Sequence, residues 1–196
     1  MSALTTVLGI GNPLMGDDGV GITLLEQLMA GGLEQPVEFV DGGTIGLSLL
    51  PLVLDTDSLL VLDAVAGPGP GTGSGTGSGS EPGTVVHLSG DQLPRLLRMK
   101  LSPHQVGLLD VLAGARLLGS EPSRMAVVGI VPGYVDLRLG LGPEVEAAVP
   151  LALELAREVL REWWAADSGL LAPAGQVAGG TGRAGGTSCS GSSTST

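Results

Sequence analysis

Four aspartates and one histidine carry most of the chemistry that this sequence of 196 residues can offer. They are Asp17, Asp18, Asp41, Asp63 and His104. An imidazole combined with two or three carboxylates forms a nitrogen and oxygen donor set that suits a borderline divalent metal such as zinc, nickel or cobalt. The chain has a single cysteine and no serine in a nucleophile elbow, so neither a cysteine metal cage nor nucleophilic catalysis is supported. The residue types therefore predict a metal site with open positions.

The first two aspartates interrupt a glycine-rich stretch, GIGNPLMGDDGVG, that begins like a nucleotide-binding turn. A dinucleotide fingerprint requires a third glycine where this sequence has Leu14, and the carboxylates of Asp17 and Asp18 would repel a phosphate. A cation is the ligand that this turn could hold. Either aspartate could instead cap the helix that follows, because Asp is a favoured N-cap residue and its charge suits the helix dipole.

Asp41 and Asp63 each come at the end of a predicted strand. Ligands of open α/β sheets bind beyond the carboxyl ends of the strands, so we expect these carboxylates at the same edge as the N-terminal turn. Asp63 follows an almost wholly apolar strand, where a charge without a partner carries a large desolvation cost, and this favours a functional role for Asp63. Alternatively, Asp63 is a loop residue that caps the next turn. In DGGT (41–44), Thr44 is expected to cap the next helix, and Asp41 could act as a base.

His104 lies in the stretch KLSPHQVGLLDVL, at the predicted start of a helix. Neutral imidazole is the commonest metal ligand among side chains, which favours a ligand role for this histidine. A surface cap is the alternative, although Ser102 already offers a capping hydroxyl. The only other histidine, His87, falls within a predicted strand and is expected to be structural.

Short apolar runs alternate with stretches of helical period, which predicts an α/β fold with helices layered on a sheet. The predicted strands are LTTVLGIG (4–11), VEFVDGG (37–43), SLLVLDAV (58–65), GTVVHLSG (83–90) and RMAVVGIVP (124–132). The predicted helices span 19–29, 44–54, 104–118 and 143–164, the last with a kink at Pro150. The continuous apolar third strand indicates a central position, covered on both faces.

Composition predicts one domain over residues 1–164, because the chain is long enough for a buried core and 43% of its residues are hydrophobic. We expect a Gly/Ser/Thr-rich insert at 66–83 to be a flexible loop and a small-residue tail at 165–196 to be disordered. The net charge of −11, with only nine Lys and Arg, argues against nucleic acid as a partner. No apolar run has the length of a membrane span and no signal peptide is evident, so we expect a soluble, cytoplasmic monomer.

Five motifs, taken together, resemble those of the nickel-iron hydrogenase maturation endopeptidases. They are GIGNPLMGDDGVG, DGGTIG, LLVLDAV, LSPHQVGLLDVL and VVGIVP followed by LGLGPEVEAAVP, in that family's order. The SPHQ form is closer to the branch that serves uptake-type hydrogenases than to the branch that serves formate-linked ones. The insert and the glycine-rich tail depart from the family, and the insert begins so soon after Asp63 that it bears on access to the predicted site.

The resemblance implies a three-layer α/β/α sandwich with a twisted, five-stranded, mostly parallel sheet. It also implies an endopeptidase that removes the C-terminal extension of the hydrogenase large-subunit precursor once nickel has been inserted. The family's metal ligands fall on Asp18, Asp63 and His104. We expect the nickel to arrive with the substrate, with zinc or cadmium able to replace it in vitro. A non-catalytic nickel chaperone or docking module for the precursor is the alternative.

Overall fold

The computed structural model describes residues 4–44, 46–65, 81–90 and 103–169; for residues 103–107 and 109 it describes the backbone alone. At its centre is a five-stranded sheet with the strand order β2-β1-β3-β5-β4. The strands are β1 (Thr5–Ile10), β2 (Glu38–Gly43), β3 (Ser58–Ala64), β4 (Val85–Ser89) and β5 (Arg124–Ile130). All neighbouring strands pair in parallel except β4, which pairs antiparallel with β5 at one edge. The prediction of a mostly parallel sheet is therefore confirmed.

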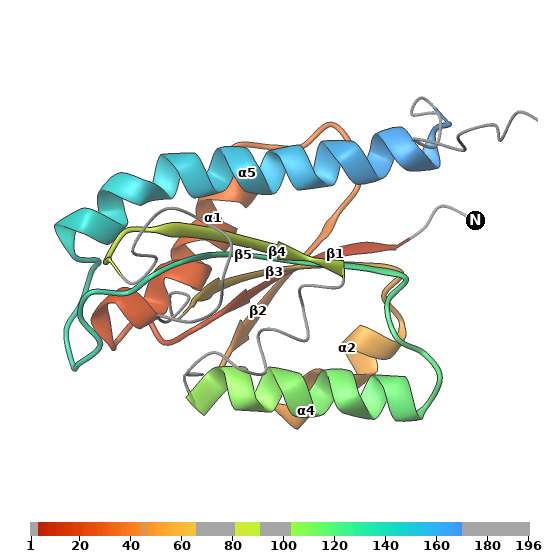
Figure 1. Ribbon diagram of the computed structural model, residues 1–196, viewed down its shortest axis with the longest axis horizontal. Coiled ribbons are helices and arrows are strands. Elements are labelled where there is room, and N and C mark those ends of the chain that lie inside the picture. The colour runs from red at the N-terminus through yellow and green to blue at the C-terminus, as the bar shows by residue number, and fades with distance from the viewer. Residues whose placement is uncertain (1–3, 45, 66–80, 91–102, 170–196) are drawn as a thin grey trace, which may run out of the picture.

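Helices cover both faces of this sheet, which gives the expected three layers (Figure 1). One face carries α1 and α5, and the other carries α2 and α4. The helices are α1 (Val20–Ala30), α2 (Leu50–Leu54), α4 (Pro103–Leu117) and α5 (Pro143–Asp167), with short 3-10 helices η1 (Gly16–Gly19) before α1 and η2 (Leu47–Leu49) before α2. Among the described residues, no helix is both long enough and apolar enough to cross a membrane.

The side chains of β3 show how the two layers of core are filled. Successive side chains of a strand point to opposite faces, so Leu60 and Leu62 join the core beneath α1 and α5. Leu59 and Val61 join the core beneath α2 and α4. Every residue of β3 is buried, which confirms its predicted central position. Asp63 continues this strand and has the same parity as Leu59 and Val61, which places it on the α4 face.

The helix predicted over 44–54 is shorter than expected. The chain forms η2 after Gly46 and becomes α-helical only from Leu50. Thr44 does not cap this helix, because the N-cap positions are Gly46 for η2 and Leu49 for α2, and neither uses a side chain. A glycine two residues after Thr44 delays the helix, since glycine pays the largest entropy on entering one.

The final helix runs through Pro150 and continues past Trp164 to Asp167. Its extra turn is held by Arg124 at the start of β5. The guanidinium of Arg124 donates to both carboxylate oxygens of Asp167 at 2.7 Å and to the carbonyl of Trp163 at 3.0 Å. A long-range pair of this kind cannot be recognised from the local sequence.

The predicted insert and tail fall largely outside the described residues. The structure describes the end of the insert, where the Gly83 amide donates to the carbonyl of Val131 at 2.9 Å. A Cβ on Gly83 would press on the Glu144 carbonyl at the start of α5, so the backbone passes close to that helix. The chain thus re-enters the domain beside the loop that joins β5 to α5.

Candidate functional site

The turn after β1 is shaped by two close backbone approaches that only glycine allows. Gly11 has φ +133°, and a Cβ at that position would overlap the carbonyl oxygen of Asp18. A Cβ on Gly21 would overlap the carbonyl oxygens of Ile10 and Leu62 at the ends of β1 and β3. The glycine-rich stretch therefore folds η1 and the first turn of α1 tightly onto the end of the sheet.

Asp18 and Asp63 are both buried at this end of the sheet. Asp18 is 3% exposed, and its Oδ2 accepts a hydrogen bond from the Asn12 amide at 2.9 Å. Asp63 is 2% exposed, and its Oδ1 accepts one from the Ala64 amide at 2.7 Å. Because η1 packs against β3, the two carboxylates belong to adjoining elements. The structure thus places the two predicted carboxylate ligands on adjoining elements at the carboxyl end of the sheet.

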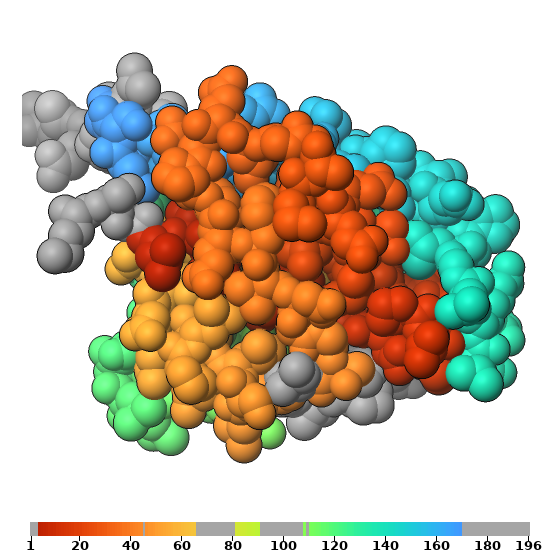
Figure 2. Space-filling view, turned by 180° about the vertical axis from the view of Figure 1, so that it is seen from behind, coloured from red at the N-terminus to blue at the C-terminus, as the bar shows by residue number. Residues whose placement is uncertain are grey.

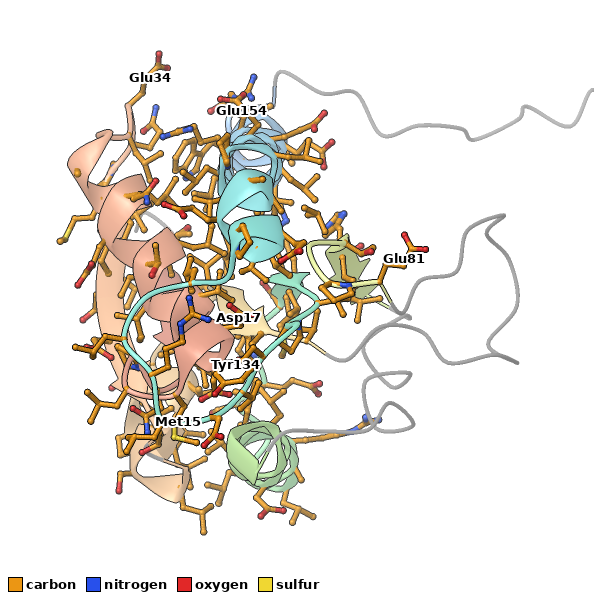
Figure 3. All side chains as sticks on the ribbon, turned by 90° about the vertical axis from the view of Figure 1, so that its left-hand side faces the viewer. Met15, Asp17, Glu34, Glu81, Tyr134 and Glu154 are labelled. Carbon is orange, nitrogen blue, oxygen red and sulfur yellow. The ribbon has the colours of Figure 1, made fainter. Side chains whose placement is uncertain are left out.

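Asp17, the immediate neighbour of Asp18, has a different role from the predicted cap of the following helix. Its Oδ2 accepts hydrogen bonds from the amides of Gly133 and Tyr134, both at 2.8 Å, and its Oδ1 accepts one from Gly142 at 2.6 Å. Gly142 is the N-cap residue of α5, so this carboxylate sits at the N-terminus of α5 and not of α1. Figure 3 shows Asp17 beside Tyr134 under the β5–α5 loop.

His104 is the second residue of α4, and the structure describes its backbone. One turn later, Leu108 lines a small pocket together with Ile10 of β1 and with Gly42 and Gly43 of β2. The start of α4 therefore lies at the carboxyl ends of the strands, the end that also holds Asp18 and Asp63. Figure 1 shows α4 starting below this end of the sheet.

Asp41 is placed apart from the other predicted site residues. It lies on edge strand β2, is exposed, and its Oδ1 accepts a hydrogen bond from the Gly43 amide at 2.9 Å. Asp41 pairs with Gly9 of β1, so a whole strand separates it from Asp63, a distance of about 10 Å. Its neighbour Val40 packs toward α2 and α4, so Asp41 faces the opposite side. The structure does not bring Asp41 together with Asp63.

The buried charges at this edge are all negative. The described residues bury three carboxylates, those of Asp17, Asp18 and Asp63, and no side chain of Lys, Arg or His. Three backbone amides and the N-terminus of α5 compensate the charge of Asp17. Asp18 and Asp63, on the adjoining elements η1 and β3, are the other two buried carboxylates at this edge, and a cation bound by both would lower the electrostatic cost of burying them.

A metal could be held here by carboxylate oxygens from Asp18 and Asp63 with an imidazole from the start of α4. Among the side chains that the structure describes, no group of three metal-ligating residues is assembled. The side chain of His104 is outside that set, so the three-ligand site stays a prediction. An oxygen and nitrogen site with two or three protein ligands leaves positions open for groups from a substrate.

Comparison with known proteins gives consistent matches. A family model described as hydrogenase maturation protease matches residues 22–159. The chain is 37% identical over 157 residues to the hydrogenase 2 maturation protease of Escherichia coli strain K12, which covers 80% of this chain and 90% of that one. The fold is similar to the hydrogenase maturating endopeptidase HybD from E. coli, with a TM-score of 0.70, 36% identity and coverage of 82% and 93%. It is also similar to the [NiFe] hydrogenase maturation protease HybD from Thermococcus kodakarensis, with a TM-score of 0.64, 27% identity and coverage of 80% and 98%.

Proposed function

The chain belongs to the hydrogenase maturation protease family, and from that premise we propose that it removes the C-terminal extension of a nickel-iron hydrogenase large-subunit precursor after nickel insertion. Membership makes it an endopeptidase that processes a hydrogenase precursor. We further propose how the enzyme distinguishes a precursor that is ready to be cut. The nickel in the precursor's half-built centre is the recognition element, and it belongs to the substrate.

One observation carries this proposal: two of the three predicted metal ligands, Asp18 and Asp63, lie buried on the adjoining elements η1 and β3 at the carboxyl end of the sheet. A divalent ion bound by both carboxylates would lower the electrostatic cost of burying them. A resident ion would defeat a check on maturation, however. The carboxylate pair suits a site that receives its cation with each substrate.

In the proposed complex, Asp18 and Asp63 contribute oxygen ligands to the nickel and His104 contributes a nitrogen ligand. Their charge and the shape of the edge would orient the precursor so that its scissile bond lies beside the metal. A metal at that place could polarise the scissile carbonyl or lower the pKa of an attacking water. Zinc or cadmium would be expected to occupy the same ligands in vitro, since both accept nitrogen and oxygen donors.

Asp41 as the base that activates water stays a prediction. A general base must come within hydrogen-bond reach of the proton that it takes. Asp41 is exposed on edge strand β2 and faces away from Asp63. To use it, the substrate would have to bend round the end of this strand.

That the enzyme is monomeric and cytoplasmic also stays a prediction from the sequence.

The test is a cleavage assay on purified precursor, isolated with and without nickel, with the products weighed by mass spectrometry. The wild-type protein and the Glu34→Gln variant should release a C-terminal peptide from the nickel-loaded precursor only. Glu34 is the matched control because it is an exposed carboxylate far from Asp17 (Figure 3). The His104→Ala variant should release none.

Two other outcomes would count against the proposal. Nickel-dependent binding of the precursor by the wild-type protein, with no loss of mass, would favour a nickel chaperone or docking module. The purified protein could also contain one tightly bound zinc ion per molecule. This would contradict the proposal that the metal comes with the substrate, because a resident ion would already occupy the ligands.

A further inference from the structure

The loop that joins β5 to α5, residues 131–142, exposes an unusual number of large apolar side chains. Tyr134 is 45% exposed, Val135 51%, Leu137 79% and Leu139 76%. Leu14, from the turn after β1, is 56% exposed. We call these five residues the loop patch. Isolated apolar residues on a surface are ordinary, but a group of them from two adjoining segments marks a site of interaction.

The loop patch rests on a fixed backbone. Asp17 holds the loop at both ends, through the amides of Gly133 and Tyr134 and through that of Gly142. Hydrogen bonds that backbone amides donate to a carboxylate are among the stronger ones in proteins. The protein therefore uses a buried charge to fix the backbone of this loop, although the exposed side chains of the loop patch add little to the core.

Backbone bonds join the loop to the turn after β1 as well. The Gly16 amide donates to the Arg138 carbonyl at 2.8 Å, and the Arg138 amide donates to the Leu14 carbonyl at 3.0 Å. This two-way bonding brings Leu14 beside the loop. Figure 2 shows the turquoise atoms of the loop at one end of the molecule, bordering the red and orange atoms of the N-terminal segment.

The loop patch adjoins the proposed nickel site. Asp17 anchors the loop, and Asp18 is the next residue along the chain, so their Cα atoms are about 3.8 Å apart. A protein that presents nickel to Asp18 must therefore lie close to the anchored loop. The apolar surface and the ligand are thus near enough to contact the same large partner.

The charge of the loop also differs from that of the rest of the chain. Residues 131–142 contain one acid, Asp136, and one base, Arg138, in a chain with a net charge of −11. The Arg138 guanidinium lies 5.7 Å from the Tyr134 ring, which keeps a positive charge beside the apolar side chains. The loop is thus a neutral area on an acidic protein, where a large partner can approach without repulsion.

We propose that the loop patch is the docking surface for the folded body of the hydrogenase large-subunit precursor, which it meets through an exposed apolar area next to the half-built nickel centre. This inference rests on the proposed function. It divides recognition into two parts: the loop patch supplies affinity for the precursor, and the nickel ligands decide whether the docked precursor is cut. Docking would then occur with or without nickel, while cleavage would require it.

The test compares the double variant Leu137→Ser/Leu139→Ser with the control Leu117→Ser/Leu118→Ser. Leu117 and Leu118, at the end of α4, are 89% and 64% exposed, so both pairs remove similar exposed apolar surface. We expect the loop variant to raise the precursor concentration for half-maximal cleavage about tenfold or more and to leave the saturated rate within about twofold. The control should change neither. The unfolding midpoint of both variants should match the wild type, since the replaced side chains are exposed.

Binding of nickel-free precursor, measured with immobilised protein, separates this inference from the proposed function. If the wild-type protein binds this precursor but does not cut the nickel-loaded one either, the proposed function fails, and the docking surface stands if the loop variant binds about tenfold more weakly. Equal binding by the loop variant and the wild type would overturn the docking surface while leaving the protease intact. A wild-type dimer that the loop variant converts to monomer would assign the loop patch to a second copy of this chain and would also overturn the inference.

Discussion

Two neighbouring regions of the same sheet edge use buried carboxylates for opposite purposes. In the first, which we call the clamp, Asp17 accepts three backbone amides and fixes the β5–α5 loop. In the second, which we call the ligand pair, Asp18 and Asp63 lie buried on η1 and β3, where Asp18 accepts the Asn12 amide and Asp63 accepts the Ala64 amide. The comparison teaches that burial alone does not identify a functional carboxylate. Asp17 binds three amides of one distant loop, whereas Asp18 and Asp63 are the predicted metal ligands.

The largest expected effect is on the ligand pair. Asp63→Asn keeps the size of the side chain and an oxygen that can accept the Ala64 amide, but it removes the charge that would bind nickel. We expect the cleavage rate of nickel-loaded precursor to fall about a thousandfold, because the loss of metal binding removes several kcal/mol of transition-state stabilisation. The free energy of unfolding should change far less than this rate, since Asn keeps the volume of the side chain and the hydrogen bond from Ala64. A timed mass-spectrometric assay and denaturant unfolding measure the two quantities.

The matching change in the clamp should have the reverse pattern. Asp17→Asn replaces charge-assisted bonds by weaker ones and turns an NH2 group toward amide donors. We expect the free energy of unfolding to fall by about 2–4 kcal/mol, measured by urea denaturation. The saturated cleavage rate of the molecules that remain folded should fall far less than in Asp63→Asn. A thousandfold loss of that rate with unchanged stability would mean that Asp17, too, belongs to the site.

The smallest expected effect is at Asp41. Because Asp41 is exposed and faces away from Asp63, we expect Asp41→Asn to lower the cleavage rate less than about tenfold, below the usual contribution of a general base. Stability should change little, since the amide oxygen can still accept the Gly43 N–H. A loss of about a hundredfold or more in the same timed assay would instead assign the base to Asp41.

Much of the fold could be predicted from the sequence because its signals are local. All five strands were identified from short apolar runs, and the buried third strand from its lack of polar alternation. The Gly-x-Gly at the end of β1 also predicts a close backbone approach, and its two glycines, Gly9 and Gly11, pass close to the carbonyls of Gly21 and Asp18.

The rest depended on contacts that no local window contains. For Asp17 the sequence offered a cap of the next helix as one alternative, and it could not show the true partners because they lie 116 to 125 residues away. The prediction that Asp41 and Asp63 converge assumed that strand ends alone bring side chains together. It ignored strand parity, which sends Asp41 and Asp63 to opposite faces. Only the order of the strands and their register reveal that difference.

The central claim is that the ligand pair binds nickel that arrives with the substrate, and that cleavage depends on this binding. The most direct test is to add nickel in steps to nickel-free precursor, in the presence of metal-free wild-type protein, and to count the peptide released by mass spectrometry. The account predicts that peptide release rises in proportion to the nickel bound by the precursor and stops when its centres are full. Equal release from nickel-free precursor would contradict it.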